Sequence, residues 1–257
     1  MDLVLYEVKE RVGYLTLNRP EKRNALSFEL VTALQEAFIK AENDPDVKVV
    51  VLRANGEAFC AGADLAYLQQ LQKFSLEENL ADSNRLKELF LKIYQLKKVV
   101  IAQVQGHALA GGCGLATVCD FVFAVPEAKF GYTEVKIGFV PALVLVFLIR
   151  KMGETHARHL LLSGELVQGN DAMDFGLINQ LVSRDKLTET VWEFAQKLIR
   201  NNSAQSMTLT KQMIDRVHSL SLQDALAYAV SVNAEARASE DCKKGIAAFL
   251  NKEDLTW

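Results

Sequence analysis

The stretch that decides the fold covers residues 99–115 and reads Val99-Val100-Ile101-Ala102-Gln103-Val104-Gln105-Gly106-His107-Ala108-Leu109-Ala110-Gly111-Gly112-Cys113-Gly114-Leu115. It begins with mostly apolar, β-branched residues, which are typical of a buried strand. The glycine-rich residues 106–114 then lead into a short apolar helix, whose free N-terminal N–H groups favour negative charge. The stretch therefore predicts a strand, a loop that lets a ligand approach the backbone closely, and a helix.

A second loop of the same kind lies earlier in the chain. Residues 47–52 predict a buried strand, and Phe59-Cys60-Ala61-Gly62-Ala63-Asp64-Leu65 follows it and leads into a helix. Small residues allow close approach of a ligand to the backbone. Two N–H groups that converge on one point form an oxyanion hole. Each loop alone is equally an ordinary turn between a strand and a helix.

Strands and helices alternate along the rest of the chain. The expected elements are strands at 3–8 and 12–17 forming a hairpin around Lys9-Glu10-Arg11, a helix after Ser27 with Leu30, Leu34, Phe38 and Ala41 on its buried face, helical residues 64–97 with a polar break from Lys73 to Asp82, strands at 121–125 and 178–182, and helices only from Asp185 onward. This order indicates an α/β fold. With no Ser/Gly/Pro-rich linker, we predict a core domain at 1–199 and a helical oligomerisation region at 200–257.

Composition excludes several classes of protein. Half of the 257 residues are hydrophobic and the formal net charge is −3, which argues against recruitment of nucleic acid by bulk charge. The most apolar window, residues 139–149, is about 11 residues long and too short to span a bilayer. No signal peptide is visible, so we expect a cytoplasmic protein. The four cysteines have no zinc-ligand spacing and are interpreted as thiols that fill space, and we predict no metal site. Lys97 and Lys98 are interpreted as solvated.

Glu134 is the candidate acid or base. It stands in Phe130-Gly131-Tyr132-Thr133-Glu134-Val135-Lys136-Ile137-Gly138-Phe139-Val140-Pro141, among apolar and small residues. A carboxylate in such surroundings tends toward a raised pKa and transfers protons near neutral pH. The alternative is a loop glutamate paired with Lys136. We interpret His107 as structural, His156 and His159 as solvated, and Cys113 as lacking an activating base.

Five segments in order resemble the crotonase, or enoyl-CoA hydratase/isomerase, superfamily. They are the two loops, the segment around Glu134, Asn18-Arg19-Pro20-Glu21-Lys22-Arg23-Asn24-Ala25-Leu26, and Gly245-Ile246-Ala247-Ala248-Phe249-Leu250-Asn251-Lys252. The resemblance implies an α/β, ClpP-like fold of repeated ββα units with an all-helical C-terminal trimerisation region. It also implies a homo-trimer or a homo-hexamer built as a dimer of trimers.

The resemblance further implies the roles of individual residues. The backbone N–H groups of Ala63 and Gly111 would bind the oxygen of an acyl-CoA thioester, and Glu134 would be the catalytic carboxylate. The coenzyme A moiety would contact Lys22, Ala25, Asp64, Leu65, Ala66 and Gly112, and also Lys252, which would reach CoA on a neighbouring subunit. Coenzyme A is part of the substrate, so no separate cofactor is expected.

Gly114 departs from the family pattern. Two-glutamate hydratases carry an acid at this position, so Glu134 alone remains here. Residues 134–144 resemble bacterial hydratases of the 3-methylglutaconyl-CoA type, which act in leucine degradation. Our preferred expectation is hydration of an enoyl-CoA. The alternatives are an enoyl-CoA delta-isomerase that uses Glu134 alone and a non-catalytic acyl-CoA-binding protein.

Overall fold

The computed structural model describes residues 2–257, and its largest sheet has six strands in the order β1-β2-β3-β4-β6-β9. The strands are β1 (Val4–Lys9), β2 (Val12–Leu17), β3 (Val49–Ala54), β4 (Val99–Val104), β6 (Phe121–Ala124) and β9 (Gln180–Leu181). Strands β1 and β2 form the expected antiparallel hairpin, and all other neighbouring pairs are parallel. Glu10 and Arg11 make its tight turn with φ of 48° and 64°. Strand β3 begins two residues later than the predicted 47–52.

A second, three-stranded sheet was not predicted from the sequence. It consists of β5 (Ala108–Leu109), β7 (Lys129–Gly131) and β8 (Val167–Gln168). Strands β5 and β7 are parallel, and β7 and β8 are antiparallel. Each strand is too short to show the alternation of apolar and polar residues by which a strand is recognised. This small sheet joins the second loop to the segment that carries Glu134.

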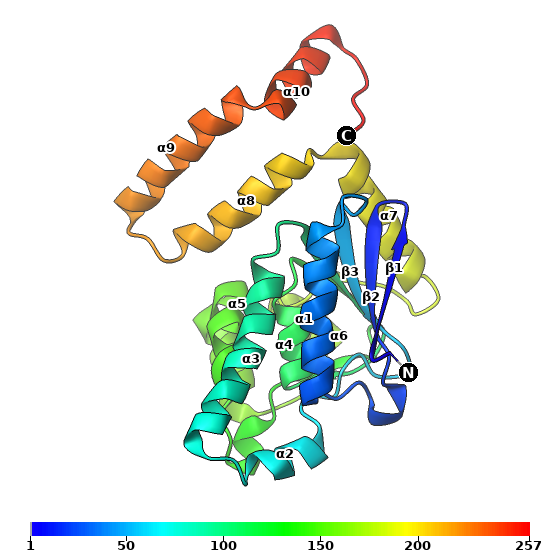
Figure 1. Cartoon of the computed structure of the whole chain (residues 1–257), viewed down its shortest axis with the longest axis vertical. Coiled ribbons are helices and arrows are strands. Elements are labelled where there is room, and N and C mark those ends of the chain that lie inside the picture. The colour runs from blue at the N-terminus through cyan, green and yellow to red at the C-terminus, as the bar shows by residue number, and fades with distance from the viewer. Residues whose placement is uncertain (1) are drawn as a thin grey trace.

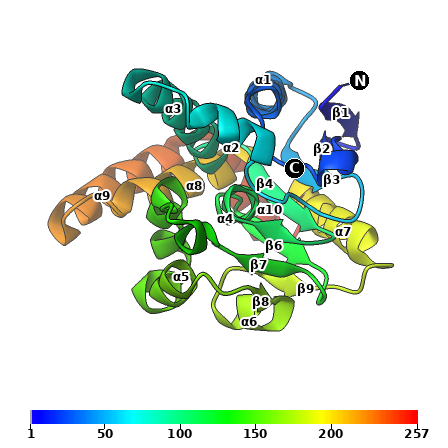
Figure 2. The same cartoon turned by 90° about the horizontal axis from the view of Figure 1, so that it is seen from below.

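Helix α1 (Phe28–Asn43) matches its prediction. Ser27 caps it by accepting a hydrogen bond from the Leu30 N–H, and Leu30, Leu34, Phe38 and Ala41 are buried. Figure 2 shows α1 and α7 (Leu187–Asn201) on opposite sides of the sheet. Other helices of the core are η1 (Pro20–Lys22), α2 (Leu65–Leu71), α3 (Leu76–Tyr94), α4 (Gly111–Thr117), η2 (Glu134–Ile137), α5 (Ala142–Ser163) and α6 (Gly169–Asp174).

The predicted polar break from Lys73 to Asp82 is wrong in its extent. Helix α2 (Leu65–Leu71) ends there, but α3 (Leu76–Tyr94) begins only a few residues later. Ser75 accepts a hydrogen bond from the Glu78 N–H, and the Glu78 side chain accepts one from the Ser75 N–H. This capping box starts a new helix in the middle of the polar run.

The last three helices project from the core as an arm (Figure 1). We call α8 (Ala204–Val217), α9 (Leu222–Ala238) and α10 (Glu240–Asn251) the arm. Only helices follow Asp185 in the described chain, as predicted. The chain then returns to the core, where the Trp257 N–H donates to the Arg200 carbonyl and Arg11 donates to the Trp257 carbonyl. Within residues 2–257, no helix is both long and apolar enough to cross a membrane.

Candidate active site

The two predicted loops leave the carboxyl ends of neighbouring parallel strands, β3 and β4, and meet at one edge of the sheet. The N–H groups of Phe59 and Cys60 donate to the His107 carbonyl at 3.1 and 3.2 Å. The Leu109 N–H donates back to the Cys60 carbonyl at 3.0 Å. Three backbone hydrogen bonds therefore hold the two loops together.

Three glycines allow this close approach. A Cβ on Gly106 would lie 1.7 Å from the Glu57 carbonyl oxygen, and one on Gly112 would lie 2.2 Å from the Cys60 oxygen. Gly62 has a φ of +91°, and its Cβ would lie 2.9 Å from the Leu109 oxygen. Since each added Cβ would meet backbone, which moves little, these positions require glycine.

The N–H groups of Ala63 and Gly111 are free of intramolecular acceptors. Ala63 forms a parallel bridge with Leu26, in which the Gly62 carbonyl and the Asp64 N–H are bonded. Gly111 is the first residue of α4, so its N–H has no acceptor within the helix. Among residues 2–257, no backbone carbonyl accepts a hydrogen bond from either group. Both are available to a ligand.

Ala110, between β5 and α4, has an unusual backbone conformation. Its φ of 49° and ψ of −125° lie in a region that residues with a Cβ rarely adopt. Such strain costs about 1–3 kcal/mol and persists where the surroundings impose it, often at functional sites. Here the Ala110 N–H is fixed by the Gly131 carbonyl at 2.8 Å, which turns the chain sharply into Gly111.

Glu134 begins η2, directly after β7. Pairing of β7 with β5 brings it to the same region as the second loop. Its carboxylate is half-buried, and one oxygen, Oε2, is buried without a hydrogen-bond partner. Burial raises the pKa of Glu134 above its ordinary value. No ion pair joins Glu134 to Lys136 in the described chain, so the alternative interpretation of this residue is wrong.

Gly114 is fully enclosed by apolar side chains. A Cβ there would lie 2.5 Å from Val144 Cγ1 and 2.9 Å from Phe90 Cζ. The space that an acidic side chain would need at this position is therefore filled by α3 and α5, and Glu134 is left as the only carboxylate of the three candidate segments with a raised pKa. This arrangement was not predictable from the sequence.

The predicted CoA-contact residues divide into groups of different exposure. Lys22, Leu65 and Ala66 are exposed beside Ala63, whereas Ala25 and Gly112 are buried. The Asp64 side chain is engaged inside the protein, since it pairs with Arg19 at 2.7 Å and caps α2 by accepting from the Ala66 and Tyr67 N–H groups. The Asp64 N–H donates to the Leu26 carbonyl and its carbonyl accepts from the Leu68 N–H, so only a second lone pair of that carbonyl is left for a CoA contact.

Lys252 is not brought to the two loops within one chain. It caps α10 with a φ of 54°, and α10 lies at the opposite end of the molecule from α2, the helix that follows Ala63 (Figure 1). A role for Lys252 therefore requires a neighbouring subunit, as the resemblance implied.

The remaining candidates have structural explanations. The His107 Nδ1 accepts a hydrogen bond from the Lys129 N–H at 3.1 Å, which supports its interpretation as structural. Burial raises the pKa of Cys113 to about 11, so its thiolate is scarce at neutral pH. His159 is exposed, but His156 is half-buried and stacks on Phe175 with ring centroids 4.6 Å apart, so the expectation that it is solvated is wrong in part. No group of metal-ligating side chains is present in residues 2–257.

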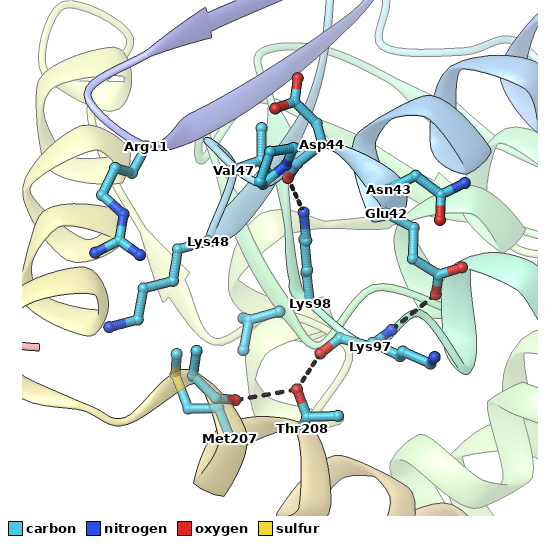
Figure 3. A pocket seen from close by; sticks show the side chains of 13 residues that line it. Arg11, Glu42, Asn43, Asp44, Val47, Lys48, Lys97, Lys98, Met207 and Thr208 are labelled. Atoms are coloured by element: carbon cyan, nitrogen blue, oxygen red, sulfur yellow. Dashed lines mark hydrogen bonds between the residues drawn. The ribbon is translucent and has the colours of Figure 1, made fainter. Parts of the chain in front are cut away.

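Figure 3 shows the lining of a cavity of about 320 Å³. It lies at the opposite end of the sheet from the two loops, which follow the carboxyl ends of β3 and β4. It is bounded by the amino ends of β3 and β4 and by α8. The Lys48 ammonium in its wall donates to the Ile199 carbonyl at 2.6 Å, and burial lowers its pKa to about 8. Lys98 donates to the Ala41 and Asp44 carbonyls at 2.7 and 2.5 Å, so it is anchored rather than solvated as predicted. Backbone carbonyls account for both ammonium groups, and the cavity is separate from the candidate active site.

The family model for enoyl-CoA hydratase/isomerase matches residues 7–257. The chain belongs to this family. A Thermus thermophilus protein with a provisional enoyl-CoA hydratase name is 43% identical over 95% of this chain and 96% of its own length. The 2,3-dehydroadipyl-CoA hydratase of Escherichia coli is 34% identical over 98% of this chain and 97% of its own length. The crystal structure of a Mycobacterium smegmatis enoyl-CoA hydratase covers 99% of this chain and 98% of its own, with a TM-score of 0.93 and 33% identity.

Membership confirms the predicted family and its α/β fold with a helical C-terminal region, and it confirms an enzyme of the enoyl-CoA hydratase/isomerase family. The similar proteins carry several substrate names, among them short-chain enoyl-CoA and 2,3-dehydroadipyl-CoA. They do not single out the 3-methylglutaconyl-CoA type.

Proposed function

We propose that this protein adds water reversibly to the double bond of a 2-enoyl-CoA thioester. The observation that carries the proposal is the pair of free N–H groups at Ala63 and Gly111, on loops that touch, together with the half-buried Glu134. The hydratase names of the similar proteins support hydration over other reactions of the family.

In this reaction the two N–H groups donate hydrogen bonds to the thioester carbonyl oxygen as its negative charge grows. Polarisation of the carbonyl makes the β-carbon electrophilic, water adds there, and the enolate is stabilised until a proton reaches the α-carbon. Loss of one donor of this kind typically costs about 3–4 kcal/mol of transition-state stabilisation. Because these donors are backbone groups, the loop contacts at Gly62 and Gly112 determine where they point.

Glu134 is the general acid and base in this proposal. Its carboxylate orients the attacking water and takes its proton, and the carboxylic acid so formed relays a proton to the α-carbon. The raised pKa suits this exchange, because an acid and base works best when its pKa lies near the working pH. Phe90 and Val144 fill the place of a second acid at Gly114, so all proton transfer falls to Glu134 or to water that it holds.

Isomerisation of the double bond between positions 3 and 2 is the second candidate, since one carboxylate is enough to move a proton between two carbons. The apolar enclosure of Gly114 favours this alternative. A non-catalytic acyl-CoA-binding protein is the third. The unpaired Oε2 of Glu134 argues against it, because a buried carboxylate oxygen without a partner destabilises a fold and is retained at a cost.

For the acyl group we propose a branched glutaconyl-CoA such as 3-methylglutaconyl-CoA, with leucine degradation as the context. The support is the resemblance of residues 134–144. The CoA moiety is assigned to Lys22, Ala25, Asp64, Leu65, Ala66 and Gly112 of one subunit and to Lys252 of the next. A panel that includes 3-methylglutaconyl-CoA, 2,3-dehydroadipyl-CoA and straight-chain 2-enoyl-CoA tests this choice by kcat/KM.

We also propose that the protein forms a homo-trimer or a dimer of trimers through residues 200–257, with 1–199 as the core. The support is the apolar surface of the arm, where Leu222, Val230 and Phe249 are 79, 70 and 83% exposed. Apolar surface on this scale is typical of protein contacts. Sedimentation equilibrium of the whole chain and of an F249D variant tests the assignment. A cytoplasmic location and the lack of a separate cofactor, nucleic acid or membrane partner stay predictions.

The decisive experiment compares wild type with Glu134→Gln in water labelled with oxygen-18, using 2-enoyl-CoA and 3-enoyl-CoA. Hydration gives a labelled 3-hydroxyacyl-CoA from the 2-enoyl substrate. Conversion of the 3-enoyl-CoA to the 2-enoyl-CoA without incorporation of oxygen-18 indicates isomerisation instead. Glu134→Gln should lower turnover by orders of magnitude and leave CoA affinity unchanged. The matched control is Glu154→Gln, which removes an exposed carboxylate that pairs only with Arg158. Full turnover in Glu134→Gln would exclude the assignment of Glu134.

A further inference from the structure

Tyr132 makes the side-chain hydrogen bond that joins the segment of Glu134 to the helix of Gly111. It is fully buried, two residues before Glu134, although its hydroxyl is polar. The Tyr132 hydroxyl lies 2.8 Å from Thr117 Oγ1, at the last residue of α4. No other side-chain hydrogen bond involves residues 132–137 in the described chain.

Counting hydrogens gives the direction of this contact. The Thr117 hydroxyl donates its single hydrogen to the Cys113 carbonyl at 2.9 Å. It therefore has no hydrogen left for Tyr132, and the tyrosine must donate to Thr117 Oγ1. The result is a directed chain from the Tyr132 hydroxyl through Thr117 to the backbone of α4, one residue before Gly114.

In the described chain, no backbone hydrogen bond joins residues 132–137 to α4 or to the second loop. The last hydrogen bond between the strand segment and the second loop runs from the Ala110 N–H to the Gly131 carbonyl at 2.8 Å. Beyond it, η2 contains its own turn bonds from Lys136 to Thr133 and from Phe139 to Glu134, which do not fix it to α4. The Tyr132 hydroxyl thus makes the one side-chain hydrogen bond between residues 132–137 and α4 in the described chain, in addition to the packing of η2 and α4 on α5.

We propose that Tyr132 is a positioning residue, whose hydrogen bond to Thr117 holds the Glu134 carboxylate in place relative to the oxyanion donor at Gly111. This inference rests on the proposed roles of Glu134 and Gly111 and assigns a residue to their geometry. Misplacement of a reacting group by about 1 Å costs about 100-fold in rate. The ring of Tyr132 provides packing, and the hydroxyl provides alignment.

The test uses Tyr132→Phe and Thr117→Val, which each remove one side of the contact and keep most of the volume. Each should lower kcat about tenfold or more with little change in KM. The double variant should be no worse than either single variant, because both remove one interaction. Thr117→Ser keeps the hydroxyl and should remain near wild type. The acid limb of the kcat profile should move to lower pH in Tyr132→Phe, because a looser Glu134 is better hydrated.

Tyr6→Phe is the matched control, since it removes a phenol hydrogen bond of the same length, 2.8 Å to Asp44, at the far edge of the sheet. It should lower stability without changing kcat or the pH profile. A second readout does not depend on turnover: amide hydrogen exchange of peptides covering 132–137 should speed up in Tyr132→Phe and not in Tyr6→Phe.

The outcomes separate the two proposals. Loss of activity in Glu134→Gln with wild-type kcat and wild-type exchange in Tyr132→Phe overturns the positioning role alone. Full turnover in Glu134→Gln overturns the proposed function. Hydrogen exchange in Tyr132→Phe then decides whether the hydrogen bond from Tyr132 to Thr117 holds residues 132–137 in place. Equal kcat losses in Tyr132→Phe and Tyr6→Phe reduce Tyr132 to a stability residue and overturn the inference.

Discussion

Gly112 packs directly against the Cys60 carbonyl, and an added Cβ would lie 2.2 Å from that oxygen. Two loops that are about fifty residues apart in the chain thus touch backbone to backbone, next to Gly111. An added Cβ at Gly112, like one at Gly62 or Gly106, would push the loops apart and displace the free N–H groups of Ala63 and Gly111. The position of the candidate oxyanion hole therefore depends on glycine at these three contacts.

Replacement of Gly112 by alanine should separate the loops. We expect a loss of about 1–3 kcal/mol in the free energy of unfolding, typical of overpacking, and a larger proportional loss of kcat. Chemical denaturation and steady-state kinetics measure the two effects. Gly245→Ala is the control, because its Cβ would lie 3.4 Å from Trp257 in open helix, where alanine stabilises by up to about 1 kcal/mol. Wild-type kcat in Gly112→Ala would contradict the role of this contact.

The enclosure of Gly114 predicts that an acid cannot simply be restored there. Gly114→Ala alone should lower the free energy of unfolding by about 1–3 kcal/mol, because its Cβ would lie 2.5 Å from Val144. Val144→Ala removes the obstructing methyl groups, so the double variant should be more stable than the sum of the single losses implies. Thermal denaturation of all four proteins measures this coupling. Strictly additive losses would show that Val144 does not fill the site.

The burial of Glu134 predicts a pH dependence of stability. Its pKa is raised from 4.5 in the folded protein, so the folded state holds its proton to higher pH than the unfolded state does. Wild type should therefore lose stability as the pH rises from the unfolded-state pKa of Glu134 through its folded-state pKa. The stability of Glu134→Gln lacks this contribution, because glutamine does not titrate. The variant should be more stable than wild type at about pH 8 and gain little at about pH 4. Denaturation at both pH values measures this, and a constant difference would contradict the raised pKa.

Lys48 predicts the opposite trend at alkaline pH. Its pKa is lowered from 10.5 to about 8, first by burial and then by Arg11, so the unfolded state binds more protons between these values. Wild type should therefore gain stability relative to Lys48→Met as the pH rises from about 8 to about 10. Lys97→Met, which changes an exposed neighbour in the same cavity wall, is the control. Parallel pH curves for wild type and Lys48→Met would show that Lys48 titrates normally.

The sequence is sufficient to predict those helices and strands that are long enough to show a regular spacing of apolar residues. The hairpin of β1 and β2 and the buried face of α1 follow from alternation and helical spacing alone. Ser75 and Glu78 have capping-box spacing, so the sequence also carries a signal for the start of α3. The polar residues around them hide this signal, because a polar run is equally typical of a break between helices. The small sheet of β5, β7 and β8 was not readable, because strands of two or three residues carry no period.

The candidate site divides in the same way. Ala63, Gly111 and Glu134 were predicted because each lies in a local motif, and the family resemblance joined them. The surroundings were not predicted, because they are contacts between distant segments. The filling of Gly114 by Phe90 and Val144, the pairing of Asp64 with Arg19, and the hydrogen bond from Tyr132 to Thr117 all depend on how helices and strands pack.

The free N–H groups at Ala63 and Gly111 belong to the main chain, so no replacement other than proline deletes them. Any other substitution at these positions changes only the bulk around the donors, and a donor is lost only with proline or when its peptide bond is replaced by an ester. In the proposed reaction, the polarising half of the site is thus encoded in the path of the backbone, and the proton-transferring half in the identity of Glu134. At Gly114 this chain lacks a second acid, whereas both loops keep their free N–H groups.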